Sequence, residues 1–197
     1  MITLALERFA GSWTWYGIRA AGWVAAILLV LTVLMGIGQV TGFTYRYIEP
    51  IQAWAIHKAT SLALAVAIAI HIGLLLIDKY MHFSLAQILI PFTSNYNNGT
   101  KLLGLGLGSL AIAFGVLAMY GIALIVLTSL GWIDSKKEAW QKIHFISYLV
   151  ALFVILHVLY SGTDVRSGWL RAIWIILALV VVAGFISRIR RSGSLKP

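Results

Sequence analysis

The sequence predicts an all-α membrane protein, a bundle of about five transmembrane helices, and three observations support this prediction. The 197-residue chain is 61% hydrophobic and only 11% charged, which excludes an ordinary soluble domain. Its apolar runs are long and continuous, whereas a membrane β-barrel would show segments of about ten residues with alternating hydrophobicity. The chain has no cysteine, which excludes disulfides, thiolate-bound clusters and cysteine nucleophiles.

Five apolar segments are each long enough to cross a hydrocarbon core of about 30 Å at about 1.5 Å per residue. The first follows Trp13, Trp15 and Tyr16, an aromatic stretch typical of the membrane interface. The second follows Pro50, which suits the first turn of a helix. The expected spans are residues 16–40, 51–77, 102–130, 140–160 and 169–189. They predict a single domain over residues 1–197, without an internal repeat.

The one long connection joins the second and third spans. Residues 82–90 are expected to form a short amphipathic helix on the membrane surface, ended by Pro91, and residues 93–99 read as a polar turn. The glycine-rich run at residues 104–108 follows no predicted strand and precedes no Lys-Ser or Lys-Thr pair. Helix packing therefore explains this run better than nucleotide binding does.

The formal net charge of +9 comes from 15 Lys and Arg against 6 Asp and Glu, and these charges lie at the ends of the apolar segments. Membrane lipid is therefore an expected partner, and nucleic acid is not. The basic tail and the basic connection at residues 136–142 lie on the same side of a five-helix bundle, which the positive-inside rule makes cytoplasmic. The first span lacks a signal-peptide cleavage pattern. We expect a multi-pass membrane protein with a cytoplasmic C-terminus.

Four of the five histidines lie in the second and fourth spans. His57 and His71 are 14 residues apart, and His144 and His157 are 13 apart. Because both spans cross the membrane in the same direction, His57 is level with His144 near the inner face, and His71 with His157 near the outer face. Ionisable side chains at membrane depth usually mark a functional path. Four imidazoles can ligate two six-coordinate haem irons, which would lie about 20 Å apart.

Helix geometry favours one histidine couple over the other. Fourteen residues fall about 40° short of four full turns, so His57 and His71 share a helix face. Thirteen residues fall about 140° short, so His144 and His157 need local tightening or a kink, although no Gly or Pro separates them. The small residues at 59–70 suit either a flat macrocycle or simple helix packing. His82 is expected to be an interfacial histidine.

Basic residues near the span ends are candidates for contacts with haem propionates. The alternative for each is ordinary snorkelling to the membrane interface. The candidates are Arg46, Lys58 and Lys142 at the inner face, and Arg19, Lys101 and Arg166 at the outer face.

The fourth span also resembles a known family. Its pattern is Trp140-x3-His144-x3-Tyr148, with His157 thirteen residues after His144 and then Ser-Gly-Thr-Asp at residues 161–164. This resembles the ferric-reductase-like transmembrane domain of NADPH oxidases, ferric reductases and the haem-binding subunit of periplasmic methionine sulfoxide reductase. The resemblance extends over about residues 16–189. It implies an inner haem b on His57 and His144 and an outer haem b on His71 and His157. Together with the compactness of the chain, it also implies a location in the bacterial plasma membrane.

The sequence departs from that family in two ways. We expect one helix fewer than in six-helix members, and no flavin and nicotinamide-nucleotide domain after Pro197. The function expected is therefore a stand-alone membrane cytochrome b, the electron-transfer component of an oxidoreductase system. A separate cytosolic flavoprotein or quinol would donate electrons, which makes a quinone a second candidate cofactor, and an acceptor on the outer side would take them. The alternatives are a haem-binding, non-catalytic subunit of a larger membrane complex and a transporter or packing protein whose histidines bind no haem.

Overall fold

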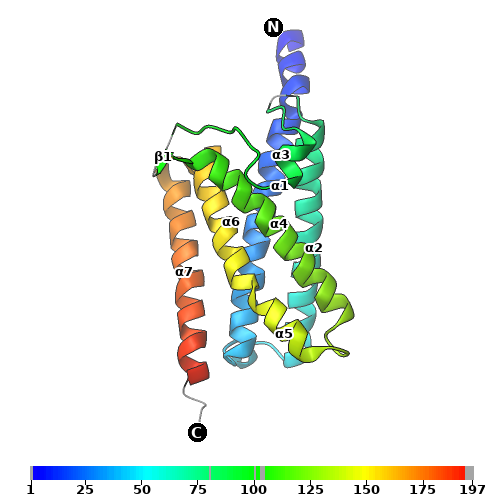
Figure 1. Ribbon diagram of the computed structural model, residues 1–197, viewed down its shortest axis with the longest axis vertical. Helices are drawn as coiled ribbons and strands as arrows, with labels where there is room; N and C mark the ends of the chain where they lie inside the picture. The colour runs from blue at the N-terminus through cyan, green and yellow to red at the C-terminus, as the bar shows by residue number, and fades with distance from the viewer. Residues whose placement is uncertain (1, 80, 100, 103–104, 194–197) are drawn as a thin grey trace.

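The computed structural model describes residues 2–79, 81–99, 101–102 and 105–193. Within these residues the chain forms seven α-helices, two 3-10 helices and two short strands (Figure 1). Their order is α1 Ile2–Val40, η1 Thr44–Arg46, α2 Pro50–Ile77, α3 Leu85–Leu89, β1 Lys101–Leu102, β2 Leu105–Gly106, α4 Leu107–Gly131, α5 Lys137–Phe145, α6 Ser147–Ser161, η2 Thr163–Val165 and α7 Gly168–Gly193.

The prediction of an all-α protein with five membrane spans is confirmed. Five helical segments are long and apolar enough to cross a membrane: Trp13–Val40, Pro50–Ile77, Leu107–Gly131, Lys137–Ser161 and Gly168–Arg190. The third helix begins at Leu107 rather than at residue 102, because Lys101 pairs with Gly106 across the antiparallel strands β1 and β2. Gly108 then packs directly on the preceding loop, since a Cβ there would lie 2.6 Å from the carbonyl oxygen of Tyr96.

The surface helix expected at residues 82–90 is present but shorter. His82 has φ of 50°, outside the helical region, and α3 begins only after Ser84. Ser84 Oγ accepts a hydrogen bond from the backbone N–H of Gln87 at 3.3 Å, and the Gln87 side chain accepts one from the backbone N–H of Ser84 at 3.0 Å. This reciprocal capping box explains why the helix starts there.

The spanning helices form two hairpins. Helix α1 packs along α2, and α4 packs along α6, while α7 packs against α1 and α6. Small residues allow this close approach, as is usual between membrane helices. A Cβ at Gly121 of α4 would lie 2.4 Å from Val150 of α6, and one at Gly184 of α7 would lie 3.1 Å from Ile37 of α1. The buried core therefore lies where α1, α2, α4, α6 and α7 meet.

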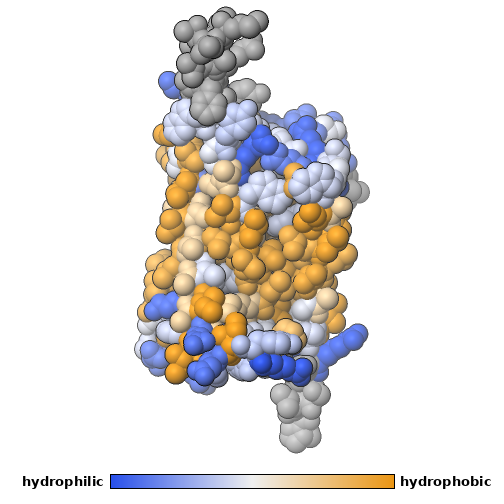
Figure 2. Space-filling view, turned by 180° about the vertical axis from the view of Figure 1, so that it is seen from behind, coloured by the Kyte–Doolittle hydropathy of each residue, from blue (hydrophilic) through white to orange (hydrophobic). Residues whose placement is uncertain are grey.

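The outer surface has the character of a membrane protein. Figure 2 shows a broad apolar band across the middle of the face in view, with polar residues toward both ends. The two chain termini lie at opposite ends of the bundle (Figure 1), as an odd number of spans requires. The apolar band is the surface that lipid would cover.

Trp174 should be a main source of stability. Its side chain is 1% exposed, donates a hydrogen bond from Nε1 to the carbonyl oxygen of Ile155 at 3.3 Å, and packs edge-on against Trp23. Trp174→Ala should lower the free energy of unfolding by about 3–5 kcal/mol, because it leaves a cavity. Thermal unfolding in one detergent measures this, with Trp169→Ala, at a 71% exposed tryptophan, as the control. Equal losses from both variants would contradict the packing described.

Candidate functional site

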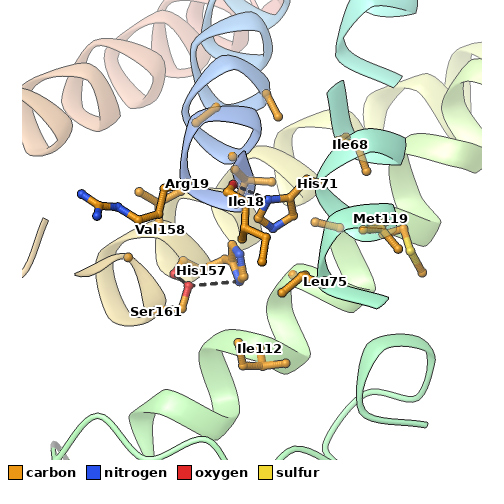
Figure 3. A pocket seen from close by; sticks show the side chains of 18 of the residues that line it. Ile18, Arg19, Ile68, His71, Leu75, Ile112, Met119, His157, Val158 and Ser161 are labelled. Atoms are coloured by element: carbon orange, nitrogen blue, oxygen red, sulfur yellow. Dashed lines mark hydrogen bonds between the residues drawn. The ribbon is translucent and has the colours of Figure 1, made fainter. Parts of the chain in front are cut away.

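Two histidines project into one cavity near the end of the bundle that carries the N-terminus. We call His71 of α2 and His157 of α6 the upper pair (Figure 3). The cavity runs from the middle of the membrane-spanning region to the connecting loops, and its walls come mainly from α1, α2, α4 and α6. The described residues that line it are predominantly apolar.

Backbone carbonyls of neighbouring helices fix the orientation of both upper imidazoles. His71 Nδ1 lies 2.9 Å from the carbonyl oxygen of Ile18 in α1, and His157 Nδ1 lies 2.8 Å from that of Ala111 in α4. A carbonyl oxygen can only accept, so each Nδ1 carries the proton. This tautomer leaves the Nε2 lone pair of each ring available to a metal.

A glycine lies against each upper imidazole, one turn after the carbonyl that binds it. A Cβ at Gly22 would lie 3.2 Å from Cε1 of His71, and one at Gly115 would lie 2.6 Å from Nδ1 of His157. The helix carbonyl is normally covered by the side chain that follows one turn later. Glycine therefore opens the helix surface so that the imidazole can reach the oxygen.

The second pair of histidines lies toward the opposite end of the bundle. We call His57 of α2 and His144 of α5 the lower pair; their ring centroids are 6.2 Å apart and their planes are inclined by 55°. Two metal–nitrogen bonds of about 2 Å, added to the distance from each nitrogen to its ring centre, require about 6 Å between centroids. The lower pair therefore has the separation expected of two imidazoles that share one iron.

The lower pair repeats the supports of the upper pair. His57 lies beside the backbone of Thr32, although its Nδ1 makes no hydrogen bond of ordinary geometry within the described chain. A Cβ at Gly36 would lie 3.2 Å from His57 Cε1. Ser129 takes the equivalent place at His144, with Oγ 3.5 Å from Nδ1. On α1 and on α4, the small residue of the lower pair follows that of the upper pair by 14 positions.

A break in the fourth span accommodates the 13-residue spacing. The span is not one helix: α5 ends at Phe145 and α6 begins at Ser147, and Ile146 lies between them (Figure 1). The N–H of Ile146 bonds to the carbonyl oxygen of Ile143 at 2.9 Å, a tightened turn of 3-10 type. This local change turns His144 relative to His157, which the geometry of an uninterrupted helix does not permit.

The outer basic candidates occupy different environments. Arg19 lines the cavity and forms an ion pair with Asp164, whose carboxylate also accepts a hydrogen bond from Trp23 Nε1 at 3.2 Å. Figure 3 shows the Arg19 side chain extending to one side of the cavity, away from His71. Lys101 and Arg166 are exposed and are not among the lining residues described.

The inner basic candidates are exposed, and a different arginine lies close to the lower pair. Arg46, Lys58 and Lys142 are all exposed, and Lys58 Nζ lies over the Trp54 ring, 5.2 Å from its centroid. Arg188 of α7 donates a hydrogen bond to the hydroxyl of Tyr148, one turn after His144, and its guanidinium lies over the Phe145 ring, 5.3 Å from the centroid. In the sequence, Arg188 reads only as part of the basic tail.

The fifth histidine, His82, takes no part in either pair. It is exposed in the connection between α2 and α3, with a positive φ. It therefore provides a natural control for experiments on the other four.

The fold defines a multi-pass helical membrane protein, and two pairs of partly buried histidines lie inside its bundle. The family model "Ferric reductase like transmembrane component" matches residues 21–156, more than half of the chain. The chain therefore belongs to this family and is a membrane electron-transfer component. The match includes His57, His71 and His144 and ends immediately before His157. No curated protein and no solved structure matches the chain.

Gly115→Ala should disturb the upper pair, because its Cβ would lie 2.6 Å from His157 Nδ1 and force the ring off the Ala111 carbonyl. The family binds haem in its membrane domain, so the measurement is haem bound per purified chain, which should fall. Gly22→Ala should have a smaller effect, because its nearest contact is 3.2 Å.

Gly73→Ala in α2 is the matched control for these glycine variants, since nothing lies within 4 Å of its Cβ. This variant should bind as much haem as the parent protein. Full haem binding and an unaltered visible spectrum in Gly115→Ala would contradict the role assigned to Gly115.

Proposed function

We propose that this protein is an integral membrane cytochrome b that relays electrons across the membrane through two bis-histidine haems b. His57 and His144 would ligate the inner haem, and His71 and His157 the outer haem. The observation that carries the proposal is the hydrogen bond from Nδ1 of each upper histidine to a backbone carbonyl, which leaves Nε2 as a metal ligand. The 6.2 Å separation of the lower rings adds independent support.

The protein supplies ligation, placement and exclusion of water. When bound, each haem supplies a one-electron carrier. The apolar walls around the upper pair keep water away from the imidazoles, and the glycines allow helices and cofactor to approach closely. The supports of the two pairs are 14 residues apart on α1, so the two levels lie about 21 Å apart along that helix.

The distribution of charge supports an orientation for the protein in the membrane. The end of the bundle with α5, the basic residues at 136–142 and the C-terminus would face the bacterial cytoplasm. A cytosolic flavoprotein, or a quinol in the membrane, would reduce the inner haem, and an acceptor on the outer side would oxidise the outer one. The exposed Lys136, Lys137 and Lys142 suit an acidic flavoprotein surface.

Propionate contacts are assigned by proximity to the pairs. Arg19, held at the edge of the upper cavity by Asp164, is the outer candidate that the structure favours over Arg166. Arg188 is a stronger inner candidate than the exposed Arg46 and Lys58, because its bond to the Tyr148 hydroxyl holds it one turn from His144. An arginine suits this task because its planar guanidinium binds carboxylates bidentately.

Single histidine replacements test the ligand assignment. The purified parent protein should hold two haems per chain, with a split or broad reduced α-band. His71→Ala and His157→Ala should each retain one haem with the same spectrum, because they destroy the same site. His57→Ala and His144→Ala should retain the other. Haem per chain and the difference spectra provide the measurement.

His82→Ala serves as the control and should keep both haems, since this exposed histidine lies outside the pairs. A colourless parent protein would refute the cytochrome proposal. Loss of different haems from two variants of one pair would refute the pairing by level.

A further inference from the structure

We propose that Ser129 and Trp140 are positioning residues for His144, and that they set the potential of the inner haem apart from that of the outer one. This inference rests on the proposed function. It starts from an asymmetry among the four histidines: a glycine lies against three imidazoles, whereas Ser129 takes the place of that glycine at His144.

The fourth support departs from the other three in two linked ways. On α4, the residues that face the lower pair come 14 positions after those that face the upper pair. The carbonyl that corresponds to those of Ile18, Thr32 and Ala111 is therefore the one of Ile125. His144 Nδ1 makes no hydrogen bond to that carbonyl within the described chain; the Thr128 hydroxyl lies 3.2 Å from it but is closer to the Leu124 carbonyl, at 2.7 Å. The residue one turn later, a glycine at the other three sites, is Ser129, whose Oγ lies 3.5 Å from His144 Nδ1.

Trp140 holds this hydroxyl in place. Its indole Nε1 donates a hydrogen bond to Ser129 Oγ at 3.0 Å, and its ring lies 5.2 Å from the His144 ring, centroid to centroid. The indole N–H can only donate, so Ser129 Oγ accepts from it. With Nε2 on the iron, His144 Nδ1 also carries a proton, and the second lone pair of the same oxygen can accept it.

A shared acceptor differs chemically from a backbone carbonyl. At the upper pair, each Nδ1–H has a carbonyl oxygen at 2.8–2.9 Å, a strong acceptor that increases the basicity of the ligand. At His144 the acceptor is a more distant hydroxyl oxygen that a second donor also uses. The Nδ1 partner of an axial histidine is one of the means by which a protein tunes the iron.

Redox titration of the purified dihaem protein, followed optically, tests the inference. Ser129→Ala removes the acceptor, so His144 becomes a less basic ligand. The reduced form of the inner haem is then stabilised relative to the oxidised form. Its reduction equilibrium constant should rise about three- to tenfold, and tenfold corresponds to about 59 mV for one electron. The potential of the outer haem should stay constant. The haem lost in His144→Ala identifies which component of the titration is the inner one.

Two further variants separate positioning from packing. Ser129→Thr keeps the hydroxyl and should restore the parent potential. Trp140→Phe keeps an aromatic ring but removes the N–H, so it should shift the inner potential while both haems remain bound.

Ser161→Ala is the matched control. Ser161 Oγ also lies 3.5 Å from a histidine Nδ1, that of His157, but this nitrogen has the Ala111 carbonyl at 2.8 Å. The variant should therefore leave both reduction equilibrium constants within about twofold, because the stronger acceptor remains.

Unchanged potentials in Ser129→Ala and Trp140→Phe, with two haems bound, would overturn this inference and leave the proposed function standing. A shift of the outer haem as large as that of the inner one would also overturn it. Loss of the inner haem from Ser129→Ala but not from Ser129→Thr would support positioning, and loss from both would reduce Ser129 to a packing role. A parent protein without haem would overturn the proposed function itself.

Discussion

The hydrogen bond between a histidine Nδ1 and a backbone carbonyl of the neighbouring helix is the interaction on which the site depends. Inside an apolar bundle, an imidazole N–H without a partner is costly, and the carbonyls of adjacent helices are available because each oxygen has a second lone pair. The bonds at His71 and His157 fix the tautomer and the ring orientation together. They also require α1 to lie close along α2, and α4 along α6, which is the arrangement observed.

This requirement explains why the two hairpins are alike although their sequences show no evident repeat. Gly22 and Gly115 occupy the same place relative to the upper histidines, and Gly36 and Ser129 the same place relative to the lower ones. On each of α1 and α4, the two small residues that face the histidines are 14 positions apart. This spacing repeats, whereas the identity of the residues around them does not. The histidine spacings differ, and the break at Ile146 absorbs the difference.

The sequence predicts the elements of this protein better than it predicts the contacts of its site. Long apolar runs and shared direction are enough to predict five spans and to place His57 level with His144. The break at Ile146 has no Gly or Pro to indicate it, so spacing shows only that some distortion is required. The spacing of Gly22 and Gly36 is visible in the sequence, but it does not assign these glycines to the histidine sites until the imidazoles that face them are known. Ion pairs are harder still to predict from the sequence, because Arg19 and Asp164 are 145 residues apart in the chain.

Electron transfer across a sealed bilayer tests the central claim most directly. Vesicles containing the purified protein and trapped ferricyanide would be treated outside with dithionite, and bleaching of ferricyanide would be followed against protein-free vesicles. The account predicts bleaching that depends on the protein and falls to the protein-free rate in His71→Ala, because one of the two levels is then empty. Bleaching no faster than in protein-free vesicles, or undiminished bleaching in His71→Ala, would contradict it.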